Sequence, residues 1–356
     1  MKKVNVFICT CLLLIITLSC EDKNNDNLTI LHYGKGVYIV NEGIFGQSSG
    51  TISYYDPTDR SIQNDIFRNV NQRDLGNVVQ SLFFLDSLAF IVVNNSNKIE
   101  IVQAHSFKEF AQILQLTQPR YFVPVSADKA YVSQWGLNLL TGSVGIIDLR
   151  NYELKGNIRN GIGKGPEQMY FDSLQGLVFV CNSGSLENDH IISVIDVQTD
   201  LVIDTIHVLD QPTQILKAND GNLWISCKGK VVYGNYPQID SVQSTEGGLV
   251  AIDPNTLQVR HCFPMGKGKP VQLITQNSAA IYFTWNETIQ KFNLQQQNMI
   301  KIYDGSFYGL SYDGQGRLYA SRFEGIQPSK VIIFENDLPI DSFRAGVFSN
   351  SFHFKN

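Results

Sequence analysis

An aromatic residue recurs inside a short apolar segment seven times along this chain. The segments read VYIVNEG, AFIVVNN, AYVSQWG, VFVCNSG, LWISCKG, IYFTWNE and LYASRFE. Their aromatic residues are 37 to 58 residues apart, at Tyr38, Phe90, Tyr131, Phe179, Trp224, Tyr282 and Tyr319. Repeats of about 40 to 50 residues with several strands each are typical of propeller blades, whereas solenoid repeats are shorter or helical. The spacing therefore predicts an all-β, seven-bladed β-propeller.

Each aromatic segment lies between two other strand patterns. An apolar strand precedes it, as in PEQMYFD, and an alternating hairpin follows it, as in HIISVIDVQTDLVID. This predicts four antiparallel strands per blade, A to D from the axis outward, with the aromatic residue in strand B. The first aromatic segment lacks a preceding strand, and AGVFSNSFHF at residues 345–354 supplies one. We therefore expect the C-terminal strand to complete the first blade and close the ring.

The N-terminus has a different composition from the rest of the chain. Lys2 and Lys3 precede an apolar run over residues 4–18, and Ser19 and Cys20 follow it. This order is typical of a bacterial secretory signal, and the run is shorter than the usual span of about 20 residues. The alternative is an uncleaved membrane anchor. The sequence TLSC resembles a lipobox, which implies a signal peptide over residues 1–19 and a lipid on Cys20.

The remaining boundaries follow from composition. Residues 20–30 are polar and acidic and predict a flexible tether, and residues 31–356 predict a single propeller domain. The net charge is −5, and removing the two leader lysines leaves −7, so phosphate-rich partners are repelled. We therefore expect no nucleic-acid partner. No CxxC or HxxxH spacing predicts a metal site, and the mature cysteines are expected to be free thiols.

The connections predicted for the two faces of the propeller differ in length. The A–B and C–D turns are short throughout. The B–C loops are longer and include NEGIFGQSSG, QWGLNLLTG, NSGSLENDH and CKGKVVYGNYPQIDSVQSTEGG. We call the face of the B–C loops and D–A connections the loop face, and the opposite one the turn face. Because loops that lengthen on a rigid scaffold commonly carry binding sites, we expect a ligand at the loop face.

The candidate binding residues lie at the starts of A strands and the ends of B strands. A glutamine column begins the A strands, and its alternative role is to hydrogen-bond neighbouring blades and channel water. Planar rings beside amide and guanidinium groups suit a large, flat, amide-bearing ligand, and they suit a glycan equally. The predicted ligand-binding residues are Gln80, Arg120, Tyr121, Trp135, Glu167, Gln168, Asn182, Gln214, Gln272, Trp285, Tyr308, Arg322 and Phe323.

Several segments resemble known propellers. ISVIDVQTDLVIDTI, VGIIDLRNYELKGNI and LVAIDPNTLQV are similar to the repeat of YncE-like, or YVTN-type, seven-bladed propellers. VNEGIFGQSSGTISYYDP and PRYFVPVSADKAYV resemble Bacteroidetes surface lipoproteins of this type, among which are propellers that capture cobalamin beside a TonB-dependent transporter. The resemblance implies a lipid-anchored outer-membrane protein that faces outside the cell. It also implies that the protein binds cobalamin or a related corrinoid as ligand, not as cofactor, and passes it to that transporter.

Catalytic patterns are weak in this sequence, so we expect a binding protein. There is no GxSxG elbow, and the six histidines do not converge in the predicted fold. A recurring aspartate resembles a carboxylate cluster, but it lies at predicted turns, where Asx caps are typical. These aspartates are Asp56, Asp148, Asp196 and Asp253. The alternatives are a glycan-binding or scaffold propeller and a propeller lyase or hydrolase.

Overall fold

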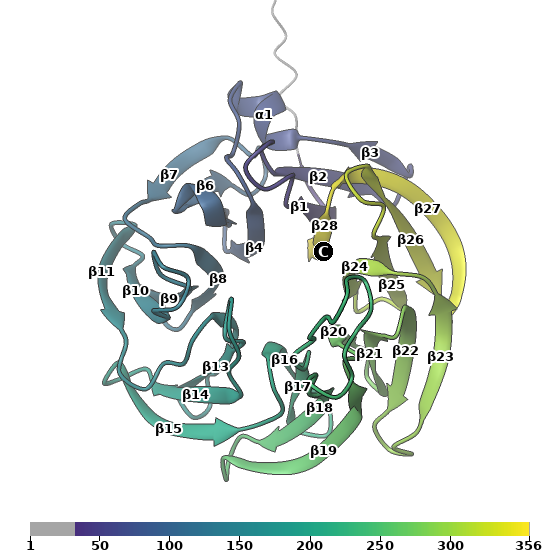
Figure 1. The fold of residues 1–356 in the computed structure, drawn as a ribbon. Helices are drawn as coiled ribbons and strands as arrows, with labels where there is room; N and C mark the ends of the chain where they lie inside the picture. Colours follow the sequence, from purple (N-terminus) through teal and green to yellow (C-terminus); the bar gives the residue numbers. More distant parts are fainter. Residues whose placement is uncertain (1–32, 356) are drawn as a thin grey trace, which may run out of the picture. The chain divides into compact units, whose positions relative to one another are not determined.

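The computed structural model describes residues 33–355. The predicted signal peptide, the lipidation site at Cys20 and the tether lie outside this range. The described residues form seven four-stranded antiparallel sheets arranged as a ring (Figure 1). The predicted fold class is confirmed. No helix in residues 33–355 is long and apolar enough to cross a bilayer.

The first four blades use the C-terminal strand and then the chain in order, here from strand A to strand D. Blade 1 consists of β28 (Ser349–Lys355), β1 (Gly36–Asn41), β2 (Thr51–Asp56) and β3 (Ser61–Gln63). Blade 2 consists of β4 (Val79–Leu85), β5 (Leu88–Val93), β6 (Lys98–Gln103) and β7 (Glu109–Ile113). Blade 3 consists of β8 (Pro119–Pro124), β9 (Lys129–Gln134), β10 (Ser143–Asp148) and β11 (Glu153–Ile158). Blade 4 consists of β12 (Pro166–Asp172), β13 (Leu177–Asn182), β14 (Ile191–Asp196) and β15 (Leu201–His207).

The last three blades follow the same order. Blade 5 consists of β16 (Pro212–Lys217), β17 (Leu223–Cys227), β18 (Glu246–Asp253) and β19 (Gln258–Lys267). Blade 6 consists of β20 (Val271–Gln276), β21 (Ala280–Trp285), β22 (Thr288–Asn293) and β23 (Met299–Asp304). Blade 7 consists of β24 (Phe307–Tyr312), β25 (Arg317–Arg322), β26 (Pro328–Glu335) and β27 (Leu338–Val347). The short helices α1 (Ile66–Asn71) and η1 (Asn94–Ser96) lie in connections.

The aromatic column forms part of the packing between blades. All seven aromatic residues lie in B strands and are at most 3% exposed. The polar atoms of these rings have protein partners; for example, Trp224 Nε1 donates to Asp220 of its own blade at 3.0 Å, and Tyr282 Oη donates to Asp337 of the next blade at 2.9 Å. Burying each ring stabilises the fold by about 1.5–3 kcal/mol. The repeat that identifies the fold is therefore scaffold.

The C-terminal strand closes the ring, as predicted. β28 pairs antiparallel with β1, with Phe352 opposite Ile39 and Phe354 opposite Val37. The predicted inner strand began too early, at residue 345. Val347 instead ends β27, where it pairs with Pro328, because the outer strand of blade 7 is ten residues long.

The recurring aspartates cap turns on the turn face. Each accepts a backbone N–H from the residue two positions later, as Asp196 does from Gln198 at 2.7 Å. The same bond is made by Asp56, Asp148 and Asp253. This confirms the Asx-cap prediction. Cys181 and Cys227 are free thiols that pack together between blades 4 and 5, and burial raises the pKa of each.

Candidate functional site

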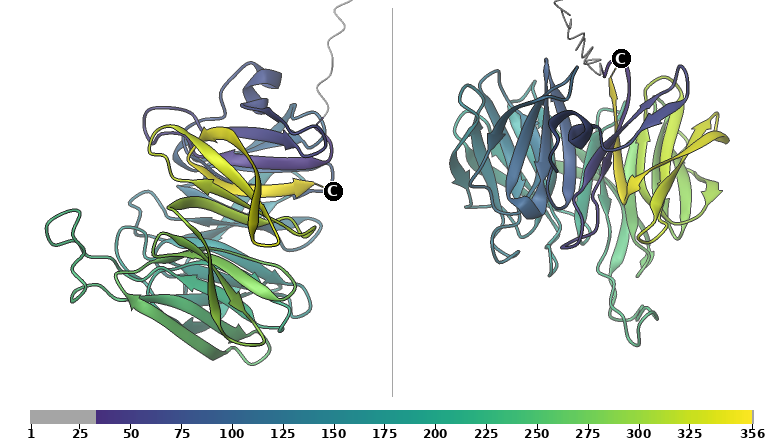
Figure 2. Two further views of the ribbon diagram at one scale, coloured as in Figure 1. Left: turned by 90° about the vertical axis from the view of Figure 1, so that its right-hand side faces the viewer. Right: turned by 90° about the horizontal axis from the view of Figure 1, so that it is seen from above.

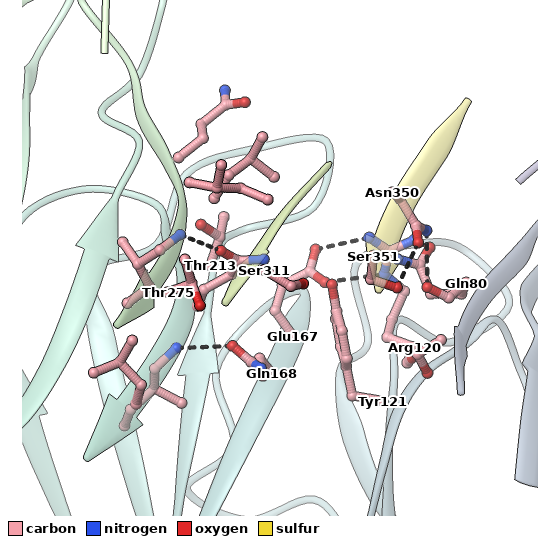
Figure 3. A pocket seen from close by; sticks show the side chains of 18 of the residues that line it. Gln80, Arg120, Tyr121, Glu167, Gln168, Thr213, Thr275, Ser311, Asn350 and Ser351 are labelled. Carbon is pink, nitrogen blue, oxygen red and sulfur yellow. Dashed lines mark hydrogen bonds and ion pairs between the residues drawn. The ribbon is translucent and has the colours of Figure 1, made fainter. Parts of the chain in front are cut away.

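The inner strands enclose a cavity of about 790 Å³ along the propeller axis (Figure 3). Every blade contributes a side chain from near the start of its A strand, which lies toward the loop face. These residues are Gln80, Arg120, Glu167, Gln214, Gln272, Tyr308 and Asn350. Residues just beyond B strands, among them Trp135 and Lys228, also line the cavity. Side chains from the loop face therefore surround one part of this cavity.

The structure brings most of the predicted ligand-binding residues together in this cavity. They come from A strands of six blades and from one B–C loop. The predicted residues that line it are Gln80, Arg120, Tyr121, Trp135, Glu167, Gln168, Gln214, Gln272 and Tyr308. The geometry thus supports the loop face and the axis as the place to look for a ligand.

Four predicted residues do not line the cavity. Asn182 is fully buried and its amide donates only within its own blade. Trp285 donates its indole N–H to the backbone oxygen of Met265 at 3.1 Å. Arg322 ends β25, and Phe323 follows it as a half-exposed ring. These four residues therefore lie outside the cavity wall, and a ligand-binding role for them stays a prediction.

For Asn182 the difference is one position along the chain, whereas the residue after Arg322, Phe323, does not line the cavity either. Consecutive side chains in a strand point to opposite sides, so the last residue of a B strand and the next residue face different surroundings. In four blades the last residue of the B strand is at most 1% exposed; these residues are Asn41, Gln134, Asn182 and Cys227. The residues that follow them line the cavity, at Glu42, Trp135, Ser183 and Lys228.

Arg120 and Glu167 form a bidentate ion pair in the cavity wall. The Nε–Oε2 and Nη2–Oε1 distances are 3.0 and 3.2 Å, and the two side chains are 16% and 7% exposed. Arg120 also donates to Gln80 Oε1 and lies 4.2 Å above the Trp135 ring. Burial raises the pKa of Glu167, and Arg120 opposes that rise. Burial disfavours the charged guanidinium, but Glu167 together with Tyr121 and Glu42 outweighs this and raises the pKa of Arg120.

A second carboxylate, Glu42, is held on the opposite side of Gln80. Tyr308 Oη donates to its Oε2 at 2.6 Å, and Asn350 Nδ2 donates to its Oε1 at 2.9 Å. Asn350 Nδ2 also donates to the backbone oxygen of Gln80 at 2.9 Å. Burial, followed by the Glu42 charge, raises the pKa of Tyr308. Sequence reasoning missed Asn350, although its position in the closing strand corresponds to the starts of the other A strands.

Part of the glutamine column joins neighbouring blades. Gln168 Oε1 accepts from the backbone N–H of Ile215 at 2.9 Å, and Gln214 Oε1 accepts from that of Ile274 at 2.7 Å. The alternative role foreseen for this column is therefore observed at both positions. Neither Nε2 atom has a hydrogen-bond partner among residues 33–355, and the same holds for the Gln272 amide. The amide nitrogens of Gln168, Gln214 and Gln272 are therefore available to a ligand in the cavity.

His353 lines the cavity from β28 as a neutral imidazole. Its Nε2 lies 3.2 Å from Ser351 Oγ, and burial lowers the pKa of its ring to about 4. Between pH 6.5 and 4 the unfolded chain binds a proton here that the folded protein does not. The free energy of unfolding therefore falls as the pH drops through this window.

His353→Gln is expected to remove this part of the pH dependence. Between pH 7 and pH 4 the free energy of unfolding of the variant should rise by about 2 kcal/mol relative to that of wild type. This is less than the full pKa shift of His353 would give, because the ring keeps some contact with solvent. Urea unfolding at pH 7, 5.5 and 4 measures the difference. Parallel stability profiles for the two proteins would show that His353 titrates normally.

Exposed apolar side chains gather on the loop face. Apart from Leu174, every large exposed apolar residue in a connection lies on this side of the propeller: Phe45, Leu114, Leu137, Leu186, Tyr233, Tyr236, Ile239, Val242, Phe323 and Ile326. The loop between β17 and β18 carries four of them and projects farthest, on the side opposite the C-terminus (Figure 2). Contiguous exposed apolar surface commonly marks an interaction site.

Metal-binding side chains do not assemble around the cavity. Within residues 33–355, no three His, Cys, Asp or Glu side chains are gathered so that they could hold a metal ion. Both cavity carboxylates already accept hydrogen bonds, Glu42 from Tyr308 and Glu167 from Arg120. The geometry offers donors and rings for binding a polar ligand.

Solved structures with a similar fold have diverse descriptions. A quinonprotein alcohol dehydrogenase-like protein from Bacteroides thetaiotaomicron is 14% identical, with a TM-score of 0.64 over 91% of this chain and 79% of that one. The periplasmic gluconolactonase of Pseudomonas aeruginosa is 11% identical, with a TM-score of 0.62 over 90% and 99%. A chain of Kuenenia stuttgartiensis hydrazine synthase is 16% identical, with a TM-score of 0.60 over 74% and 85%. At these identities the likeness shows the propeller fold alone.

Sequence comparison gives a family. No curated protein matches the chain. A family model described as "Domain of unknown function (DUF5074)" matches residues 35–241, from blade 1 to the long loop of blade 5. Because the match covers more than half of the 356 residues, the chain belongs to the DUF5074 family.

Proposed function

We propose that this propeller is a lipid-anchored protein of the outer membrane, facing outside the cell, that captures a corrinoid such as cobalamin. The ligand binds at the loop face, with part of it in the axial cavity, and is passed to a TonB-dependent transporter. The observation that carries the proposal is the convergence of amide, aromatic and guanidinium groups on one cavity of about 790 Å³. Such a cavity is within the usual range for small-molecule sites.

The chemistry of the wall supports binding of an amide-bearing ligand. The Arg120 and Trp135 pair offers a flat surface, and Gln168 and Gln214 offer amide nitrogens that have no partner within residues 33–355. Stacking supplies contact area, and hydrogen bonds fix orientation. Because Glu42 and Glu167 are engaged by neighbouring side chains, we favour binding over acid–base catalysis.

The position of the termini supports docking of a partner on the loop face. β1 begins and β28 ends on the turn face, where Gly36 pairs with Lys355. An anchor upstream of β1 would therefore join the propeller on the turn face and leave the loop face free. The exposed apolar residues there, Tyr236 and Val242 above all, would suit a transporter surface.

The proposal is tested by calorimetric titration of the purified full-length protein with cyanocobalamin. We expect saturable binding with Kd below about 1 μM, equivalent to more than about 8 kcal/mol. Oligosaccharides of the outer surface are titrated in parallel. Heat from an oligosaccharide and none from cyanocobalamin would replace the proposal with the glycan-binding alternative.

Trp135→Ala should weaken cyanocobalamin binding about 30-fold. Its ring lines the cavity and supports the Arg120 guanidinium, so the change removes contact area and the stacking partner of that guanidinium. Trp135→Phe keeps a smaller aromatic ring under Arg120 and should lose about fivefold. The matched control is Phe110→Ala on outer strand β7, which removes an exposed ring away from the loop face. An equal loss in Phe110→Ala and Trp135→Ala would contradict the location of the site.

A further inference from the structure

Five side chains of the cavity wall have their acceptor oxygens in use. The carboxylates of Glu42 and Glu167 accept from protein donors, and the Gln80 amide oxygen accepts from Arg120. The amide oxygens of Gln168 and Gln214 accept from backbone N–H groups. Unpaired acceptors remain in blade 6, at Gln272 and Gln276, whereas Gln168 and Gln214 have only their amide nitrogens unpaired among residues 33–355.

Two amides with free donors and engaged oxygens lie in adjacent inner strands of blades 4 and 5. Gln168 reaches from β12 to the backbone of Ile215 in β16, next to Gln214, which reaches in turn to Ile274 in β20. With both amide oxygens fixed to the wall, each Nε2 has two N–H bonds and no partner among the described residues. This orientation makes the wall of blades 4 and 5 a donor surface.

A cation completes this wall. Lys228 follows β17, lines the cavity, and has no ion pair among residues 33–355, whereas the cavity's other cation, Arg120, is paired with Glu167. Ser185, in the B–C loop of blade 4, also lines the cavity, and its hydroxyl oxygen is buried without a hydrogen-bond partner. The Lys228 charge acts on Glu167, and a ligand group that suits this wall accepts hydrogen bonds and carries negative charge.

We propose that Gln168, Ser185, Gln214 and Lys228 form an oxyanion subsite, which takes a carboxylate or phosphate group of the bound ligand. This inference rests on the proposed function of the cavity as a ligand site and adds the chemical class that its blade 4 and blade 5 wall selects. Lys228 supplies the charge, and the two amides and the hydroxyl supply directed hydrogen bonds. In cobalamin the corresponding group is the phosphodiester of the nucleotide loop, which cobinamide lacks.

The test compares Lys228→Met with its neighbour Lys230→Met in the full-length protein. Methionine keeps the apolar stem and removes the charge, and Lys230 is exposed on the same loop without lining the cavity. Calorimetric titrations use cyanocobalamin and dicyanocobinamide. Lys228→Met should weaken cyanocobalamin binding at least tenfold and dicyanocobinamide binding less than twofold. Lys230→Met should change neither.

A second arm does not depend on corrinoid binding. Sodium phosphate and sodium acetate are added at equal ionic strength, and the melting temperatures of wild type and both variants are recorded. A site-bound anion stabilises by mass action, so the anion that fits should raise Tm by about 2 °C more in wild type and Lys230→Met than in Lys228→Met. Phosphate and acetate tell the two sources of the oxyanion apart.

The outcomes separate the two proposals. If neither corrinoid binds but the anion effect depends on Lys228, the corrinoid proposal fails and the oxyanion subsite stands. A second outcome has both corrinoids binding, Lys228→Met affecting them equally, and the anions stabilising all three proteins alike. In that case the subsite is wrong and corrinoid capture stands. If no corrinoid binds and no anion effect depends on Lys228, both are overturned.

Discussion

Glu167→Gln is expected to lower the free energy of unfolding by about 3 kcal/mol, since it removes the carboxylate paired with Arg120 and leaves only the more distant charge of Glu42. The Arg120 side chain is 16% exposed, and both of its bonds to Glu167 are 3.2 Å or shorter. The other nearby acceptor, Gln80, carries no charge to replace the carboxylate. The wall of the cavity should therefore depend on this pair for its stability.

Urea unfolding measures the effect, with two comparisons. Lys301→Met breaks an exposed pair with Asp304 and should cost at most about 1 kcal/mol. The double variant Arg120→Met/Glu167→Met removes both charges and should be more stable than Glu167→Gln, because no charge is left buried alone. A cost for Glu167→Gln no larger than that for Lys301→Met would show that the cavity solvates Arg120 without its partner.

Deleting residues 349–356 is expected to abolish cooperative unfolding altogether. The deletion removes β28 and leaves the inner edge of β1 without its partner over Gly36–Asn41. It also removes Phe352, which is 4% exposed and packs in the core between blades 7 and 1. An open ring exposes two blade surfaces and an unpaired strand edge, at a cost comparable to the 5–15 kcal/mol that stabilises an ordinary protein.

Near-UV circular dichroism during thermal unfolding reports the result. The matched control deletes residues 233–239, as many residues as β28 contains, from the exposed loop of blade 5. The ends of this deletion are already adjacent, because Asp240 N donates to Val232 O at 2.8 Å, so the control should unfold cooperatively. A folded, cooperative protein without residues 349–356 would contradict the role of β28 in closure.

The fold could be predicted because its signals are local and repeated. Aromatic residues such as Tyr131 and Trp224 occupy one position in each B strand, and turn aspartates such as Asp196 occupy another. Because these signals recur in successive blades, the irregular loops between them do not hide the pattern. The predicted start of the last inner strand, β28, was wrong because β27 is longer than the outer strands of most other blades. No residue before Phe348 signals in the sequence that β27 ends there.

The site was harder to predict because a one-residue shift moves a side chain from the cavity to the layer between blades. Asn182 and Trp135 both lie near the end of a B strand, yet only Trp135 lines the cavity. The alternation of apolar and polar residues identifies which side is buried within the strand, but it stops at the strand end. Glu42 and Lys228 lie just beyond that end, as Trp135 does, but were not among the predicted ligand-binding residues.

Hydrogen–deuterium exchange shows whether a corrinoid binds at the axial cavity and the loop face. Exchange of the full-length protein is compared with and without saturating cyanocobalamin. We expect slower exchange in the loops at residues 135–142, 183–190 and 228–245, which lie on the loop face, with unchanged exchange in the C–D turns at residues 149–152 and 197–200. Protection confined to those turns, or no protection anywhere, would contradict corrinoid binding at the loop face.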